Sequence, residues 1–308
     1  GQHISGGTVI MKKSLSFILA CLMALSAASC TSAPAASTAG TASGADESST
    51  AAAEGGDAES AEGGETESDL AYVQDKGTLV VGITYFDPMD YKEEGSDEWV
   101  GFDADMAKAF AESLGVDVEF SEITWDYKVE ELDSKAIDVV WNGMTLTDDV
   151  TSAMSTSEPY CLNAQVLVAP ADKAAGYESL TSLEGLTVAV ESGSAGEEAA
   201  TALGATTVPV QSQAAALMEV DSQTSDVAVI DLLMAGAMIG EGTSYADLTQ
   251  VANLNEMQNL PDEEYGVGFR KGSDLTDAFN EFWAEKVADG TVLEVATTYG
   301  LQDSVILD

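Results

Sequence analysis

From Leu70 onward, short apolar runs alternate with longer segments in which apolar residues recur every three or four positions. The run at 77–83 (GTLVVGI) follows a glycine turn, which is typical of a buried strand. The segment at 103–115 has helical spacing, with Asp103 expected as its N-cap and Gly115 as its C-cap. The alternation of strands and helices predicts α/β layers with mostly parallel sheets.

The same pattern continues and then restarts halfway along the chain. Strands are expected at 116–123 and 136–141, with a helix at 127–135 between them. After the crossing segment 159–170, the strand at 185–193 resembles the first strand of the chain, and 226–231 (DVAVID) resembles 138–143 (DVVWNG). Two similar halves predict two lobes. A helix at 274–290 is expected to close the chain.

Ligands of such sheets bind beyond the carboxyl ends of the strands. The segment 142–145 (NGMT) and the Asp231 that ends the later strand are therefore expected to face one cleft between the lobes. A strand-to-helix turn also offers unpaired backbone N–H groups to a ligand.

The N-terminal part of the chain is expected to direct export. Residues 1–30 comprise ten upstream residues, a basic start and an apolar segment that ends in small residues at Cys30, which is typical of a lipoprotein signal peptide. Simple secretion without lipidation is the alternative. Residues 31–69 are almost entirely Ala, Ser, Thr, Gly, Glu and Asp, so we expect a disordered tether. A lipid on Cys30 would hold the protein at the membrane surface.

Charge and composition exclude several classes of function. The formal net charge is −43, and so acidic a chain is not expected to bind nucleic acid. The only histidine, His3, precedes the signal, and Cys161 has no cysteine partner in the mature chain. Zinc sites and nucleophiles activated by histidine are therefore not expected, and neither is a cofactor. The pair Asp148-Asp149 fits the first turn of a helix better than a calcium loop.

Eight segments, in order, resemble the ABC-transporter extracytoplasmic solute-binding proteins of family 3, which are receptors for polar amino acids. They are GTLVVGITYFDPMDY, GFDADMAKAFAESLGV, LDSKAIDVVWNGMTLT, SEPY, LEGLTVAVESGSA, DVAVID, YGVGFRKGSDL and KVADGTVLEVATTYG. The resemblance extends from about Asp75 to Gly300.

The resemblance implies a periplasmic-binding-protein-like fold of type II, with two α/β lobes joined by two hinge strands. Lobe 1 would comprise residues 70–163 with 265–308, and lobe 2 residues 164–264. The hinges would lie near 160–165 and 264–267, and the lobes would close over the ligand.

The implied function is that of the binding subunit of an ABC importer: an extracytoplasmic, lipid-anchored monomer of a Gram-positive bacterium that passes an amino acid or related solute to the permease. A sensing module for a signalling receptor and a dehydratase on the same fold are the alternatives.

The resemblance also assigns ligand contacts. Phe86 and Trp125 match aromatic residues that sandwich the ligand, with a place in the core as the alternative for each. Gly143 and Thr145 match contacts to the amino and carboxylate groups of the ligand. The full expected set is Phe86, Trp125, Asn142, Gly143, Thr145, Glu191, Gly193, Ser194 and Asp231, in which Ser194 meets the carboxylate and Asp231 the α-ammonium.

The sequence departs from the family at the carboxylate clamp. Val150 stands where an arginine is expected, and the only arginine in the chain is Arg270, in a different segment. Glu191 stands where the family often has a basic residue. These departures make glutamate or aspartate the least expected ligand.

Three explanations remain open for the missing arginine. Thr145, Ser194 and helix N-termini alone could hold a carboxylate, or Lys92 or Lys128 could replace the arginine. Alternatively, the ligand could be cationic overall, such as a basic amino acid, an amine or a quaternary ammonium compound. The acidic residues favour this last explanation.

Overall fold

The computed structural model describes residues 67–308. The expected signal peptide, Cys30 and the tether up to residue 66 lie outside the described residues. Asp69, which the sequence placed at the end of the tether, is instead the first residue of helix α1 (Asp69–Lys76). Its carboxylate accepts hydrogen bonds from the buried Arg270, which draws the start of the folded part to this position. Within residues 67–308, no helix has both the length and the apolar character needed to cross a membrane.

The first sheet organises what we call lobe 1, the elements that lie before residue 164 and after residue 262. Its strands are β1 (Thr78–Ile83), β4 (Asp117–Glu122), β5 (Val139–Thr145), β6 (Ser155–Thr156), β7 (Cys161–Asn163) and β13 (Glu263–Phe269). The order is β4-β1-β5-β13-β6, and β7 pairs with β13. A separate hairpin joins β2 (Tyr91–Lys92) to β3 (Trp99–Val100).

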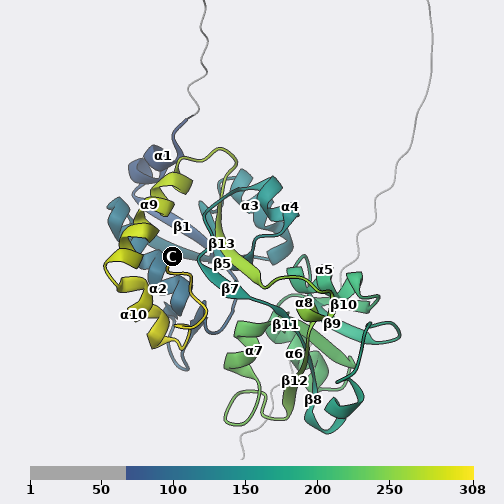
Figure 1. Cartoon of the computed structure of the whole chain (residues 1–308). Helices are drawn as coiled ribbons and strands as arrows, with labels where there is room; N and C mark the ends of the chain where they lie inside the picture. The colour runs from purple at the N-terminus through teal and green to yellow at the C-terminus, as the bar shows by residue number, and fades with distance from the viewer. Residues whose placement is uncertain (1–66) are drawn as a thin grey trace, which may run out of the picture. The chain divides into compact units, whose positions relative to one another are not determined.

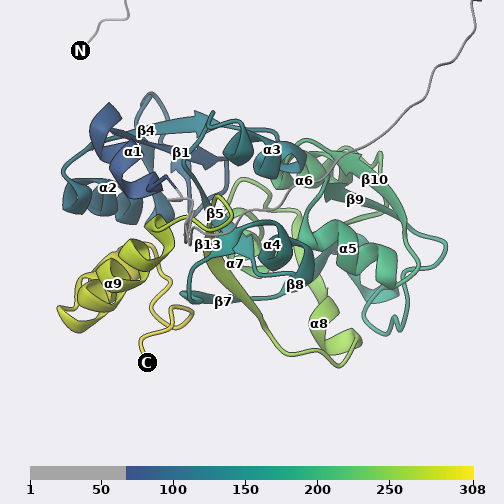
Figure 2. The same ribbon diagram turned by 90° about the horizontal axis from the view of Figure 1, so that it is seen from above.

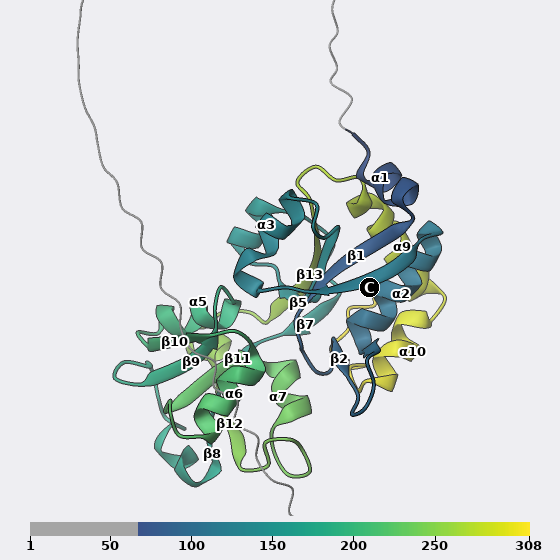
Figure 3. The same cartoon turned by 180° about the vertical axis from the view of Figure 1, so that it is seen from behind.

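Helices cover both faces of this sheet, as Figures 1 and 3 show. One face carries α2 (Phe102–Leu114), α9 (Leu275–Ala288) and α10 (Thr291–Thr298), and α1 packs against α9 and β1. The other face carries α3 (Lys128–Asp133), preceded by the 3₁₀ turn η1 (Trp125–Tyr127), and α4 (Asp148–Ala153).

The second sheet organises lobe 2, residues 165–262. Its strands are β8 (Gln165–Pro170), β9 (Thr187–Glu191), β10 (Thr206–Val210), β11 (Val227–Asp231) and β12 (Leu248–Asn253), in the order β10-β9-β11-β8-β12. Helices α5 (Ala195–Ala202) and α8 (Leu254–Met257) contribute to a different apolar cluster from α6 (Gln213–Asp221) and α7 (Leu232–Met238), so the two pairs cover opposite faces. The 3₁₀ segment η2 (Ala171–Gly176) follows β8.

Three sequence expectations need correction. The sheets are mixed rather than mostly parallel, because β13 and β8 each enter a sheet antiparallel to their neighbours. Helix α2 starts at Phe102 with Gly101 as its N-cap, so Asp103 lies inside the first turn and is fully buried. The chain closes with α10 rather than α9, because Gly290 adopts a left-handed conformation (φ 88°) that ends one helix and opens the next.

The two lobes are filled by different side chains. Lobe 1 has an aromatic core, in which Phe279 lies 5.0 Å from Trp141 and 5.5 Å from both Phe110 and Trp283, measured between ring centroids. The core between the second sheet and α5 is aliphatic, with Leu167, Val188 and Val229 among its members. Each lobe therefore buries its own apolar surface around its own sheet.

Two strands carry the chain between the lobes. The chain leaves lobe 1 along β7, enters lobe 2 at β8 with only Ala164 between them, and returns at β13. β7 and β13 pair with each other, Tyr265 opposite Cys161 and Glu263 opposite Asn163, so the two crossings lie side by side, as Figure 2 shows from above.

Candidate functional site

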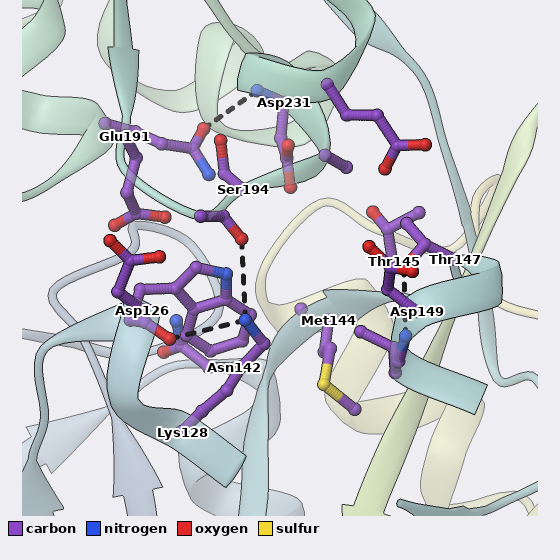
Figure 4. Close-up of a pocket in the computed structure, with 17 residues that line it drawn as sticks. Asp126, Lys128, Asn142, Met144, Thr145, Thr147, Asp149, Glu191, Ser194 and Asp231 are labelled. Atoms are coloured by element: carbon purple, nitrogen blue, oxygen red, sulfur yellow. Dashed lines mark hydrogen bonds between the residues drawn. The ribbon is translucent and has the colours of Figure 1, made fainter. Parts of the chain in front are cut away.

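A cavity of about 250 Å³ lies between the two lobes at the carboxyl ends of β5, β9 and β11. Eight of the nine expected site residues line it: Trp125, Asn142, Gly143, Thr145, Glu191, Gly193, Ser194 and Asp231. The sequence reasoning placed neither Asp126, Met144, Thr147, Asp149, Ala195, Glu198 nor Gln213 in the site, and all of these line it as well. Figure 4 shows ten of the lining residues by name, with side chains from both lobes turned toward one space.

Phe86 does not line the cavity. It is 1% exposed, and its ring packs edge-on against Tyr265 at 6.3 Å. It lies directly behind Gly143, where a Cβ atom would come within 2.6 Å of the Phe86 ring. Gly143, in the second half of β5, also has a φ of 52°, so this position needs glycine for two reasons. Phe86 therefore supports the wall of the cavity from the core instead of contacting a ligand.

Trp125 and Lys128 form the floor of the cavity on the side of lobe 1. Trp125 is 7% exposed, and the Lys128 amine lies 4.7 Å from the centre of its ring. Lys128 Nζ donates to the carbonyl oxygens of Trp125 (3.3 Å) and of Gly193 (3.4 Å). Burial lowers the pKa of Lys128, although the charges of Asp126, Glu191 and Asp149 oppose that shift. Lys92 does not line this cavity and lies over the ring of Trp99.

The contact from Lys128 to Gly193 is one of two hydrogen bonds that join the lobes at this end. The second is donated by the Ser192 hydroxyl to Asp126 Oδ2, at 2.5 Å. Gly193 has a φ of 74°, and a Cβ atom there would collide with the Asp126 carboxylate. The lobes thus approach so closely here that only glycine fits.

The carboxyl-terminal end of β5 presents acceptors more than donors. The Gly143 N–H is already donated to Asp103 Oδ2 at 2.6 Å, and Asn142 is held by two hydrogen bonds with Thr84. The Thr145 hydroxyl donates to Glu263 Oε2 at 3.0 Å, which leaves its oxygen to accept. This geometry suits a ligand ammonium better than a ligand carboxylate.

Val150 occupies the place at which the resemblance expected an arginine. It lines the cavity, is 8% exposed and belongs to an apolar cluster with Met144 and Met154. Its N–H donates to the Thr147 hydroxyl, which is the N-cap of α4. No positive charge stands at this point of the cavity wall.

On the side of lobe 2, Ser194 caps the start of α5. Its hydroxyl accepts from the Glu197 N–H at 3.2 Å, and Glu197 in turn accepts from the Gly193 N–H at 3.0 Å. Glu197 and Glu198 both lie in the first turn, where they offset the positive end of the helix dipole. Part of the attraction that this helix end has for an anion is therefore already used.

Asp231 is held at the end of β11 by neutral donors alone. Gln165 Nε2 donates to one of its oxygens at 2.7 Å, and the Tyr265 hydroxyl donates to the other at 2.6 Å. Burial, followed by the charge of Glu263, raises the pKa of Asp231 to about 7. Gln165 also donates to Glu263, so the two acids share one amide.

Glu191 ends the neighbouring strand β9 and is 4% exposed. Burial, followed by the charge of Asp231, raises the pKa of Glu191 to about 8. Figure 4 shows Glu191 next to Asp126, with Asp149 at the opposite side and Asp231 between them. The acids are thus spread along the cavity.

The contacts missed from the sequence differ in how visible they were. Asp126 is adjacent to a residue already assigned to the site, and Glu198 lies one turn beyond Ser194, so both could have been added. Gln213 begins α6, and nothing in the sequence pattern marks it as a site residue. Its Oε1 nevertheless accepts from the Asp231 N–H at 2.8 Å. Gln165 and Tyr265 stand on the crossing strands, for which the resemblance implied hinges and named no site residue.

Comparison with known proteins places the chain in a clear context. The family model of the bacterial extracellular solute-binding proteins, family 3, matches residues 79–302. The arginine-binding extracellular protein ArtP of Bacillus subtilis is 32% identical over 225 residues, which are 70% of this chain and 83% of that protein.

Solved structures agree in fold. An ABC uptake transporter substrate binding protein from Streptococcus pneumoniae with bound histidine aligns with a TM-score of 0.65 at 25% identity, covering 76% of this chain and 96% of that one. The ancestral amino acid-binding protein AncCDT-1, a precursor of cyclohexadienyl dehydratase, aligns with a TM-score of 0.66 at 29% identity, covering 75% and 99%. These matches confirm the expected fold class, a type II periplasmic-binding-protein-like arrangement of two α/β lobes.

Proposed function

Because the chain belongs to the bacterial extracellular solute-binding proteins of family 3, we propose that it captures a positively charged amino acid or related amine in the cavity between its lobes. The captured solute is then delivered to the permease of an ABC importer. Arginine, which the name of the Bacillus subtilis relative gives as its ligand, is of this charge class.

The charge of the cavity wall carries this proposal. Five carboxyl groups line the cavity, those of Asp126, Asp149, Glu191, Glu198 and Asp231. Among the described residues, Lys128 is the one basic side chain that lines it. Glu191 and Asp231 are buried, and their charged forms are poorly solvated unless a cation enters. A cationic ligand would therefore gain the most from this wall, and glutamate or aspartate the least.

Capture is proposed to involve closure of the two lobes. The two lobes would turn about hinges near 160–165 and 264–267, where β7 passes into β8 and β13 returns to lobe 1. The contacts across the cleft between Ser192 and Asp126 support this proposal, since they join the lobes where the ligand would be enclosed. Closure excludes water and so strengthens the polar contacts inside.

The site is proposed to bind without catalysis. The ancestral relative related to a dehydratase shows that the fold is compatible with enzyme activity in other chains. A cavity lined by five acids is ill suited to an anionic substrate, which is what we expect of a dehydratase acting on cyclic acids. A monomer anchored by a lipid on Cys30 and tethered by the residues between Cys30 and the folded part would hold the site outside the membrane.

A thermal-shift screen followed by calorimetry tests the proposal. Arginine, lysine, ornithine and small amines are expected to stabilise the protein by about 2.7 kcal/mol at a hundredfold excess over Kd. Glutamate, aspartate and neutral amino acids are expected to leave the unfolding temperature unchanged. Tight binding of glutamate or aspartate, with no response to any cation, would refute the charge argument.

Uptake distinguishes transport from the alternative of sensing. Cells that lack the protein are expected to lose accumulation of the labelled ligand and to regain it with the natural sequence. Asp231→Asn serves as the matched variant that is expected to express but not to restore uptake. Unchanged accumulation in cells that lack the protein would favour a sensing role.

A further inference from the structure

We propose that the preferred ligand is a linear molecule with two separated cationic groups and no carboxylate, such as an α,ω-diamine or a guanidinoalkylamine. This inference rests on the proposed function and narrows its substrate class. It follows from the charge balance, the shape and the hydrogen-bonding groups of the cavity.

The charge balance of the wall calls for more than one positive charge. Five carboxyl groups against one ammonium leave a formal charge of −4. If both buried acids, Glu191 and Asp231, keep a proton, three carboxylates and Lys128 still leave −2. The remaining acids are exposed, so solvent weakens their pull without changing its sign. A basic amino acid brings a net +1, whereas a diamine brings +2.

The acids also lie at separate places. Figure 4 places Glu191 and Asp126 at one side of the cavity and Asp149 at the other, with Asp231 between. A second cavity of about 600 Å³ borders the first at Thr145, Thr147, Ala195 and Glu198. Its lining adds Asp148, Asp262, Glu263 and Glu264 and contains no lysine or arginine among the described residues. A ligand with charges at both ends of a chain matches this distribution.

Several of the lobe 1 groups that could receive a carboxylate are already committed. Val150 is apolar, the Gly143 N–H is donated to Asp103, and the Thr145 hydroxyl proton is donated to Glu263. Lys128 is held by two backbone carbonyls and faces the charges of Asp126, Glu191 and Asp149. A ligand carboxylate would be repelled by the acidic wall, because the charge of Lys128 is already compensated. A ligand that has no carboxylate avoids this repulsion.

Matched pairs of compounds test this directly, each differing by one carboxylate. Calorimetry on the protein compares L-arginine with agmatine and L-ornithine with putrescine at one pH and ionic strength. We expect the decarboxylated member to bind at least tenfold more tightly. The inference is overturned if, in the pair of higher affinity, the amino acid binds as tightly as its partner or more tightly.

Other outcomes separate this inference from the proposed function. If the amino acid of the pair of higher affinity binds at least as tightly as its amine, the protein remains a receptor for cationic amino acids and only the inference fails. If none of the four compounds binds but a neutral amino acid does, the inference and the charge class both fail, and amino-acid binding stands. If no amino acid or amine binds, the proposed function fails with it.

A charge placed at position 150 supplies a second test. Val150→Arg should reverse the preference within each pair, because the guanidinium attracts a carboxylate and repels a second cation. Ser152→Arg adds the same charge on the exposed side of α4 and should leave the preference unchanged. An unchanged preference in a folded Val150→Arg protein, checked by circular dichroism, would count against the inference. If that variant does not fold, the paired measurement on the natural sequence decides alone.

Discussion

The protein buries carboxylates at two places and compensates their charge in opposite ways. At the outer end of lobe 1, each nitrogen of the only arginine finds a partner: Arg270 Nε donates to Asp69, Nη1 to the Ile137 carbonyl and Nη2 to Asp138. Asp138 also accepts from Lys76 at 2.5 Å. In the cleft, Asp231 is also buried, at 5% exposed, but only the neutral donors Gln165 and Tyr265 reach it.

The difference shows where the chain keeps its positive charge. A buried carboxylate needs a compensating partner, and at the outer end the protein supplies it permanently. In the cleft the protein leaves that role open, and under the proposed function a cationic ligand would fill it. We therefore expect the first centre to hold the fold together, and the second to lower the stability of the empty protein while raising its affinity for the ligand.

The largest effect is expected at the outer centre. Arg270→Met would leave Asp69 and Asp138 buried without their main partner, at a cost of about 3–5 kcal/mol of unfolding free energy. Urea denaturation measures this loss. Lys271→Met, at the adjacent exposed position, should change stability by less than about 0.5 kcal/mol. A loss of unfolding free energy below about 1 kcal/mol for Arg270→Met would contradict the view that this centre stabilises the fold more than the cleft centre does.

At the cleft centre, the corresponding change should act on affinity instead of stability. Asp231→Asn keeps the size of the side chain and can still accept from Gln165, so the empty protein should unfold at the same urea concentration or a higher one. Affinity for a cationic ligand should fall by about 2 kcal/mol or more, roughly thirtyfold, by calorimetry. If stability dropped instead and affinity held, Asp231 would be a structural acid like Asp138.

The stability of the empty protein should depend on pH through its buried acids, two of which, Glu191 and Asp231, line the cleft. The pKa of Glu191 is raised to about 8, and the pKa values of Asp231 and Asp103 are raised to about 7, in each case mainly by burial. The folded state then holds protons that the unfolded state has released, so stability falls as the pH rises from about 5 to 9.

Urea denaturation at pH 5.5 and pH 8.5 should show a loss of several kcal/mol between these pH values, because the folded protein releases these protons only near pH 7 to 8. Part of it reflects general repulsion in so acidic a chain, and the double variant Glu191→Gln with Asp231→Asn isolates the local part. This variant should show a clearly smaller loss. An equal loss in both proteins would mean that the cleft acids play no part.

The smallest effect is expected where the lobes touch. Ser192→Ala removes the hydrogen bond to Asp126 and should weaken ligand binding by about 1 kcal/mol, because that bond counts only when the lobes are together. Ser222→Ala, at an exposed position in the same lobe, is the control and should leave affinity unchanged. If both variants bound equally well, the contact would not contribute to closure.

The fold was largely predictable because its signals are local. Apolar periodicity placed β1 and α9 to within a few residues, and Gly115 ended α2 as expected. The mixed direction of the sheets was not predictable in this way, because it depends on where β8 and β13 return after crossing between the lobes.

The candidate site was predictable where it coincides with strand ends, and less so elsewhere. Asn142 to Thr145 and Asp231 line the cavity because β5 and β11 end there. Phe86 was misplaced because a loop aromatic carries no sign of which way it points, and packing against Tyr265 turned it inward. Lys128 could be offered only as an alternative, since its reach toward Gly193 depends on the distance between lobes.

The first described turn of the chain also bears on how the protein would respond to mechanical load. The Ser68 hydroxyl and the Leu70 N–H both donate to Asp274, and Arg270 donates to Asp69. The start of α1 is therefore held by hydrogen bonds to the N-cap of α9 and to the residue that follows β13. Figure 1 shows α1 at the end of lobe 1 that faces away from lobe 2. Tension applied to the chain ahead of Ser68 would act on this end of lobe 1. Lobe 2 would then be free to move relative to lobe 1 without carrying that load.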